Sequence, residues 1–462
     1  MNKRLSSFLT SFLAILLILS VSSSSCTSSH SDETDEYFFE GKPVSLSSMG
    51  GALDGNYLYF IQGCTYDVPS SGTVEVYKNP AQKMVKLNLE TLEVTCACID
   101  PLCSHTHGSG CPMFFESDDT VSNIGVVGHW LYYLYSEFVR SSNPREEESY
   151  NKPAVYLGYN LDTGETREFF SRNNVLDDTT LFFANAPLRC GDLLYTVICE
   201  FTEDAKTPDD VEYYLASYDF EHDKTEKLFQ VDDTANLNAI TNKRFYFCVA
   251  DGVNGDTAPS YSVDREGKNR IDNCPFNRLG VSFCGSRAYK SCDYIYDEKG
   301  NVIGNTDHCS MFDLRTGKWS EVPDGGGWGV SPLGDSIYYI AYDNMSEYAS
   351  LNQADFKLKH PEMTDSQLRD EYQKYQFSYV IDGSIHLMRA DPDGKNPETV
   401  ASFPSSKMII SFAGGHYLGV IFEEYDREAF DKGGEIKHTR TLNFALLDVR
   451  TGKLIEIPQS RN

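Results

Sequence analysis

The sequence predicts an all-β chain folded as a single β-propeller of seven four-stranded blades. Tyrosine, phenylalanine, leucine and valine alternate with polar residues along many short segments, and this period of two is typical of half-buried strands. The chain holds 29 tyrosines and 27 phenylalanines, which favour pleated sheet surfaces over helices. Gly-Asn, Gly-Asp, Thr-Gly and Asp-Gly pairs separate the segments and supply the positive φ that tight turns require.

One unit recurs along the chain, and it is clearest in residues 126–170. It consists of VVGHWLYYLYSEF, a polar loop and AVYLGYNLDTGETREFF, which is two strands joined by a glycine turn followed by two strands joined by an Asp-Thr-Gly turn. The other six copies span residues 44–98, 188–229, 242–271, 284–322, 332–400 and 413–457. Such a unit has exposed edges, and radial repetition shields them. Six or eight blades are the alternatives, because the fourth copy is weak; a pair of β-sandwiches or a β-solenoid fits the repeat less well.

The first and sixth copies carry features of their own. In the first copy we expect strands at residues 44–48, 56–63, 83–90 and 93–98. In the sixth copy, Thr364 to Gln367 resembles a capping box and precedes LRDEYQKYQF. The sequence therefore predicts one short helical insertion near residues 364–377.

The N-terminus resembles an export signal. Lys3 and Arg4 precede an apolar core at 8–21, so we expect a signal peptide over residues 1–25. No later stretch approaches the roughly 18 apolar residues that a membrane span needs, so any anchoring is expected at this end only.

Cys26 follows four serines and begins a polar tether over residues 26–40, ahead of a propeller domain at 41–462. This arrangement resembles a bacterial lipoprotein signal, in which the cysteine is lipidated. The resemblance implies attachment through the lipid to the outer side of the cytoplasmic membrane. Such signals usually carry leucine three positions before the cysteine, where this chain has Ser23. Secretion without lipidation, after cleavage among the serines, is therefore the alternative.

Acidic residues outnumber basic ones by 68 to 40, which gives a formal net charge of −28. A field of this sign repels phosphate backbones and excludes nucleic acid as a partner class. We expect a monomer that binds a carbohydrate or a protein.

A cysteine- and histidine-rich segment, CACIDPLCSHTHGSGCP, occupies residues 96–112. Zinc favours four cysteine or histidine ligands in a closed tetrahedral site. The segment can supply zinc or another divalent metal with such a set: Cys98, Cys103, His105 and Cys111.

Disulfides are the alternative for this segment, because an exported chain can keep them; free thiols are the third option. The candidates for local disulfides are Cys96, Cys98, Cys103 and Cys111. Cys292 and Cys309 could form a separate disulfide across the hairpin of the fifth copy, provided that their Cα atoms lie within about 7 Å.

The repeat also assigns each connection to one side of the disc. If the strands of a blade are named A to D from the axis outward, every B–C loop and every D–A connection leaves on one side, and the A–B and C–D turns leave on the other. The long B–C loops are expected at residues 64–82, 140–152, 202–211, 343–382 and 426–441. The cysteine-rich segment is expected as a D–A connection on the same side. Long loops usually carry function, so we expect the ligand-binding face there.

Catalytic motifs do not stand out. The sequence holds no G-x-S-x-G elbow, H-E-x-x-H helix or P-loop. We therefore name no catalytic residue and expect a cell-surface binding or protein-interaction module rather than an enzyme. One alternative is a carbohydrate-active enzyme, a glycosidase or lyase, with facing carboxylates at the axis. The other is a structural or sensory component of an envelope complex.

With its leader and the segment at 96–112, the repeat resembles the propeller lipoproteins of clostridia-like bacteria, a group of unknown function. Residues 331–335, SPLGD, are similar to the Ser-Pro-Asp-Gly turn of TolB-like propellers, with Leu333 in place of aspartate. These resemblances cover most of the chain beyond about residue 40. They imply a propeller fold and a cell-surface location, and they carry no established activity.

Overall fold

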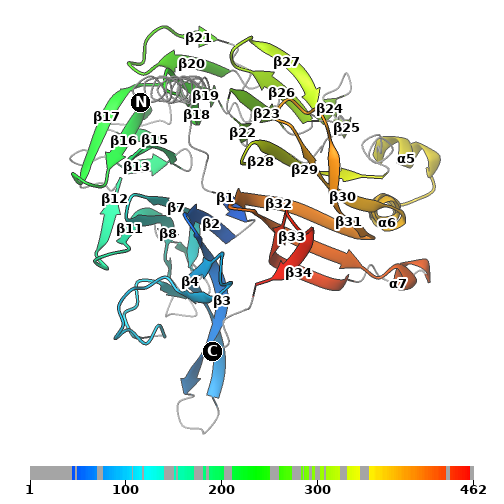
Figure 1. The fold of residues 1–462 in the computed structure, drawn as a ribbon, viewed down its shortest axis with the longest axis horizontal. Coiled ribbons are helices and arrows are strands. Elements are labelled where there is room, and N and C mark those ends of the chain that lie inside the picture. The colour runs from blue at the N-terminus through cyan, green and yellow to red at the C-terminus, as the bar shows by residue number, and fades with distance from the viewer. Residues whose placement is uncertain are drawn as a thin grey trace, which may run out of the picture.

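Seven antiparallel sheets are arranged around a common centre in a computed structural model of the chain (Figure 1). The structure describes residues 44–46, 49–69, 76–106, 108–116, 119–139, 150–151, 154–170, 180–183, 187–201, 211–249, 260–272, 282–284, 286–290, 294–296, 302–305, 309–322, 330–343, 353–432 and 438–457. The predicted signal peptide, Cys26 and the tether lie outside these residues. Each blade contains a run of four strands in chain order, to which blades one and three add further strands, so the predicted all-β fold with seven blades is confirmed, including the weak fourth copy.

Each of the first four blades is built from four strands that follow one another along the chain, as the repeat predicts. Blade one contains β2 (Met49–Asp54), β3 (Tyr57–Pro69), β4 (Val76–Asn88) and β5 (Val94–Cys96). Blade two contains β7 (Thr120–Val127), β8 (Trp130–Ser136), β11 (Val155–Asn160) and β12 (Thr166–Phe169). Blade three contains β14 (Leu188–Cys190), β15 (Leu193–Phe201), β16 (Val211–Asp219) and β17 (Lys224–Gln230), and β13 (Thr180–Phe183) also pairs with β15. Blade four contains β18 (Ala235–Ile240), β19 (Arg244–Val249), β20 (Ser260–Asp264) and β21 (Ile271–Asp272).

The last three blades follow the same order. Blade five contains β22 (Ser282–Cys284), β23 (Arg287–Lys290), β26 (Cys309–Asp313) and β27 (Lys318–Val322). Blade six contains β28 (Val330–Leu333), β29 (Ser336–Tyr342), β30 (Ser384–Ala390) and β31 (Glu398–Pro404). Blade seven contains β32 (Ser406–Gly414), β33 (Tyr417–Tyr425), β34 (His438–Asp448) and β35 (Lys453–Glu456).

Blade one differs from the prediction in two places. Its inner strand is β2, while β1 (Val44–Leu46) pairs with β2 as an additional strand, so the expected strand at 44–48 is misplaced. The expected loop at 64–82 is also wrong, because β3 and β4 pair continuously from Tyr57 and Asn88 to Pro69 and Val76. The result is a long hairpin that projects from the disc (Figure 1).

Each blade takes its four strands from one stretch of the chain, so no backbone pairing among the described strands joins blade one to blade seven. Side-chain packing joins these two blades instead. Leu58, Phe60 and Leu87 of blade one form one buried cluster with Tyr417 and Leu446 of blade seven. Burial of apolar surface between blades is therefore what holds the ring closed here.

The predicted helix near residues 364–377 is present as α6 (Asp365–Asp382), which runs five residues further than expected. Its capping box is formed as the sequence indicates: Thr364 Oγ1 accepts from the Gln367 backbone N–H at 3.4 Å, and Gln367 Oε1 accepts from the Thr364 N–H at 3.1 Å. Two shorter helices, α5 (Gln353–Lys359) and α7 (Arg427–Asp431), were not predicted. Among the described residues, no helix combines the length and apolar character needed to cross a membrane.

Five blades carry structured insertions between their B and C strands. The outer part of the hairpin formed by β3 and β4, together with helices α5, α6 and α7, belongs to this set. Two small hairpins complete it: β9 (Phe138–Val139) with β10 (Tyr150–Asn151), and β24 (Tyr294–Tyr296) with β25 (Val302–Asn305). Because strands alternate in direction, these insertions leave from the same side of the disc.

The insertions of blades six and seven contact each other. The rings of Phe377 and Tyr425 lie 5.0 Å apart in an edge-to-face arrangement. Arg427 Nη1 donates to Ile381 O at 3.2 Å and forms an ion pair with Asp382. The two insertions therefore form one continuous surface.

Candidate metal centre

The cysteine-rich segment interrupts the outer strand of blade one. Two short strands, β5 and β6 (Phe114–Glu116), both pair with β4: Cys96 lies opposite Val85, and Phe114 lies opposite Lys83. Between these pairs, Met84 O accepts from the Ala97 N–H at 3.0 Å and the Met84 N–H donates to Met113 O at 3.0 Å. Residues 97–113 thus leave the outer strand and return to it at a single residue of β4.

The sequence predicts this segment as a D–A connection on the side of the B–C loops, and the structure shows that this prediction is wrong. The loop starts only three residues into the outer strand, close to the C–D turn of its own blade. There it contacts the C–D turn of blade two, since an added Cβ on Gly164 would lie 3.6 Å from Ile99 Cγ1. The sequence could not show this, because β6 is three residues long and gives no periodic signal.

Two tyrosines of blade two hold the loop backbone. Tyr159 Oη accepts from the Ile99 N–H at 2.9 Å, and Tyr133 Oη donates to Pro112 O at 3.2 Å. Ala97 and Met113, at the two ends of the loop, are fully buried in the cluster between the blades. The loop is therefore anchored at both ends, from blade one and from blade two.

Cys98, Cys103, His105 and Cys111 converge. One ligand atom from each residue lies within 4.8 Å of the ligand atoms of the other three. In a tetrahedral zinc site, the usual bond lengths place two sulfurs about 3.8 Å apart and a sulfur and a nitrogen about 3.6 Å apart. The distance from His105 Nδ1 to Cys111 Sγ is 3.6 Å. This pair of donors thus has the separation of a tetrahedral site, and the four residues together could hold a metal ion.

The backbone directs N–H groups at all three sulfurs. The His105 N–H donates to Cys103 Sγ at 3.4 Å, and the N–H groups of Asp100 and Met113 donate in the same way to Cys98 and Cys111. In each case the donor lies two residues after the cysteine. Hydrogen bonds to the charged form of a group favour that form, so this arrangement suits thiolates.

His105 itself adopts an unusual backbone conformation, with φ at 53°. This region is uncommon for residues other than glycine. The two glycines that follow, Gly108 and Gly110, also have positive φ, at 75° and 69°. These three positions turn the chain so that Cys103, His105 and Cys111 meet.

The surroundings of Cys98 and Cys111 favour the protonated thiol when no ion is bound. Burial raises the pKa of Cys98 to about 11. The pKa of Cys111 is also raised, by the neighbouring Cys96 thiol and by burial, whereas the same contact lowers the pKa of Cys96. A metal ion would have to displace protons from its ligands, as thiolate sites require.

The disulfide alternative stays a prediction. Cys96, Cys98, Cys103 and Cys111 carry free thiols in the structure. Cys292 lies outside the described residues, so its pairing with Cys309 is untested; Cys309 is buried, with Sγ 2.7 Å from Lys290 O.

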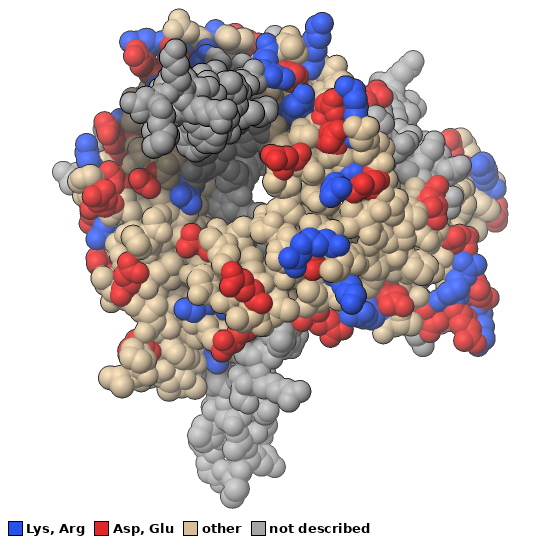
Figure 2. Space-filling model, viewed as in Figure 1, with Lys and Arg blue, Asp and Glu red and all other residues tan. Residues whose placement is uncertain are grey.

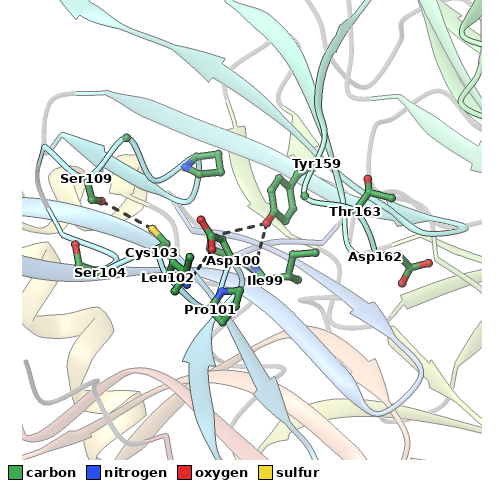
Figure 3. A pocket seen from close by; sticks show the side chains of 14 residues that line it. Ile99, Asp100, Pro101, Leu102, Cys103, Ser104, Ser109, Tyr159, Asp162 and Thr163 are labelled. Carbon is green, nitrogen blue, oxygen red and sulfur yellow. Dashed lines mark hydrogen bonds between the residues drawn. The ribbon is translucent and has the colours of Figure 1, made fainter.

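A cavity of about 810 Å³ lies beside the cluster, between the loop and the C–D turn of blade two (Figure 3). Cys98 and Cys103 line it, and Tyr159 reaches across from blade two toward Ile99. Sequence reasoning missed Tyr159, because one more tyrosine in an aromatic strand carries no signal of its own.

Few acidic groups lie on the inner strands within the part of the chain that the structure describes. Across the inner strands that the structure describes, Asp54 is the one carboxylate, while Arg189 and Lys407 are the charged residues of opposite sign. Figure 2 shows the opening near the middle of the disc, with acidic and basic side chains interspersed over the face in view. The described inner strands therefore do not supply the carboxylate pair that a glycosidase needs.

Comparison with known proteins shows similarity in architecture alone. No family model matches the chain, and no curated protein matches it. A prolyl endopeptidase structure is 12% identical with a TM-score of 0.47, and covers 93% of this chain and 52% of its own. An acylaminoacyl peptidase from Pyrococcus horikoshii is 13% identical with a TM-score of 0.46, over 92% of this chain and 53% of its own. The chain thus spans about half the length of these two enzymes.

A third solved structure has a size similar to this chain. It is the β-propeller domain of the Trilobed protease from Pyrococcus furiosus, 10% identical with a TM-score of 0.41. It covers 89% of this chain and 98% of its own.

Proposed function

We propose that the chain is an exported, lipid-anchored propeller that acts as a ligand-binding or protein-interaction module on the outer side of the cytoplasmic membrane. The observation that carries the binding role in this proposal is the set of structured insertions on the B–C connections of five blades. Those of blades six and seven join into one surface through Phe377, Tyr425 and Arg427. Elaborated loops on a rigid scaffold are where binding residues usually lie.

Binding and catalysis predict different results for this face. The purified protein would be screened against cell-wall polysaccharides and envelope proteins from the producing organism, with retention and product release measured on the same samples. A module retains one class of ligand without turnover, and replacement of residues 344–382 by a short turn abolishes that retention. Release of reducing ends or unsaturated sugars would support the enzyme alternative instead.

The anchor is tested separately through Cys26. Cys26→Ala should prevent incorporation of labelled fatty acid and release the protein from the membrane fraction, whereas Ser25→Ala should do neither. Incorporation of label that persists in Cys26→Ala would contradict the proposed lipidation site.

We also propose that Cys98, Cys103, His105 and Cys111 hold one divalent metal ion, with zinc as the first candidate. The support is the convergence of four donors within 4.8 Å, together with three N–H groups aimed at the sulfurs. When bound, zinc would supply a closed cross-link between its four ligands. Elemental analysis of protein purified under reducing conditions tests this, and a value far below one equivalent in zinc-replete medium would reject it.

A further inference from the structure

We infer that the metal is structural and that it fastens the inserted loop of residues 97–113 to the seam between blades one and two. The inference rests on the metal assignment proposed above, and it states what the ion does.

The donor set is complete without an external ligand. Catalytic zinc sites usually keep three protein ligands and leave the fourth position to water or substrate. Here three sulfurs and one imidazole nitrogen come from the chain, and all four lie within 4.8 Å of one another. The cavity beside the cluster touches Cys98 and Cys103 but is not lined by His105 or Cys111. The ion would therefore be enclosed by protein donors.

The tip of the loop has no apolar core of its own. Among the described residues from 100 to 110, Cys103 and His105 are the two that are not exposed, and Leu102 is 93% exposed. Ordering each residue of such a loop costs roughly 1–2 kcal/mol of backbone entropy, which exposed side chains do not offset. The inward-facing residues of the tip are thus the proposed ligands themselves, so a cross-link through them is what would order it.

A disulfide would account for fewer of these features. It would join two sulfurs, and it would give no role to the His105 ring 3.6 Å from Cys111 Sγ. Nor would it explain N–H donors at three separate sulfurs. One metal ion uses all of them.

Tyr159 connects this centre to blade two. Its hydroxyl donates toward Cys98 Sγ at 3.8 Å and accepts from the Ile99 N–H at 2.9 Å. It lies on β11, whereas Cys98 belongs to the loop inserted in blade one. We assign Tyr159 as a positioning residue, because it contacts a proposed metal ligand from the neighbouring blade. Loss of groups that orient metal ligands typically changes metal affinity by about 10- to 100-fold.

The experiment replaces zinc with Co²⁺ in the purified full-length protein and follows absorption, thermal stability and hydrogen exchange. We expect thiolate-to-cobalt charge-transfer bands and intense tetrahedral d–d bands that do not change when azide is added. Removal of the metal by a chelator should speed exchange in residues 97–116 and in the C–D turn of blade two, and should leave blades four to six unchanged. Cys103→Ser should behave like the metal-free protein, whereas Ser104→Ala in the same loop should behave like the wild type.

A second pair of variants tests the positioning residue. Tyr159→Phe should weaken zinc binding by about tenfold and shift the cobalt charge-transfer band. Tyr156→Phe is the matched control, because Tyr156 lies on the same strand and its hydroxyl accepts from Asn123 instead. Equal effects of the two variants would overturn the role of Tyr159.

The outcomes separate the two proposals. Binding of one equivalent of metal, with exchange in residues 97–116 unaffected by its removal, would overturn the structural role and leave the metal assignment standing. Cobalt bands that change with azide would show an open site and also overturn the inference. Absence of metal together with loss of alkylatable thiols would overturn both and establish the disulfide.

Discussion

The rings of Phe60 in blade one and Phe444 in blade seven lie 5.1 Å apart, across the junction that closes the ring. Phe60 belongs to β3 and Phe444 to β34, and the two sheets are joined there through side chains. Closure of the propeller therefore depends on packing at this junction.

Replacement of Phe60 by alanine should open that junction preferentially. Removal of a buried phenylalanine typically costs about 3–5 kcal/mol of unfolding free energy. Phe60→Ala should therefore lower the melting temperature and speed hydrogen exchange in blades one and seven. The comparison is Phe245→Ala, equally buried in the cluster of blades three and four. If Phe245→Ala speeds exchange in blades one and seven as much as Phe60→Ala does, the ring is not closed by this packing.

Gly125 on β7 is expected to tolerate no side chain. A Cβ there would lie 2.1 Å from Cζ of Tyr132, whose ring is buried against Phe169 and Phe220. Overpacking of this kind costs about 1–3 kcal/mol, so Gly125→Ala should destabilise the protein in denaturant unfolding. Gly63→Ala on β3 is the control, because nothing lies within 4 Å of its added Cβ. Similar losses for both variants would mean that strand propensity, and not the Tyr132 contact, sets the effect.

Asp343 lies at the base of the insertion in blade six, and its contribution to the free energy of unfolding should depend on pH. Its carboxylate accepts from the Ser384 N–H at 2.9 Å and lies 2.7 Å from His386 Nε2. The His386 hydrogen bond, followed by the Ser384 N–H, lowers the pKa of Asp343 below its ordinary value. The stabilisation is therefore present above the ordinary carboxyl pKa of about 3.9, and is lost as the pH falls through the lower pKa of the folded state.

Asp343→Asn tests this dependence. Because the carboxylate is half exposed, we expect a loss of at most about 1 kcal/mol at pH 7 that shrinks below about pH 4. Asp370→Asn, an exposed carboxylate on α6, should show no such change in urea unfolding. A deficit of Asp343→Asn that grows as the pH falls below about 4 would have the wrong sign.

The sequence revealed most of the fold, because strand alternation and turn residues repeat in every blade. Its errors fall where that pattern weakens. The inner strand of blade one contains Gly50 and Gly51, which carry no side-chain pattern, and the strand was placed too early. The hairpin of β3 and β4 contains Pro69 and Pro80, which are typical of loops, so its outer half was predicted as a loop. Helix α7 has five residues, too few to give a periodic signal.

The candidate metal centre was predicted in its residues but not in its place. Ligand type and spacing selected Cys98, Cys103, His105 and Cys111, and the structure brings these four together. Their location depends on pairing between β4 and two strands of three residues each, which is a tertiary property. The contact with Tyr159, 60 residues away in sequence, is equally invisible to local patterns.

The hydrogen bonds of Met84 to Ala97 and Met113 mean that the inserted loop could be removed as a unit from the outer strand of blade one. Its two ends meet at one residue of the neighbouring strand, so a chain in which a single residue joins Cys96 to Phe114 would retain an unbroken outer strand. Such a shortened chain should still fold, with near-native circular dichroism, while losing its metal. Lineages of this propeller could therefore gain, lengthen or discard the loop without rebuilding the blade that carries it.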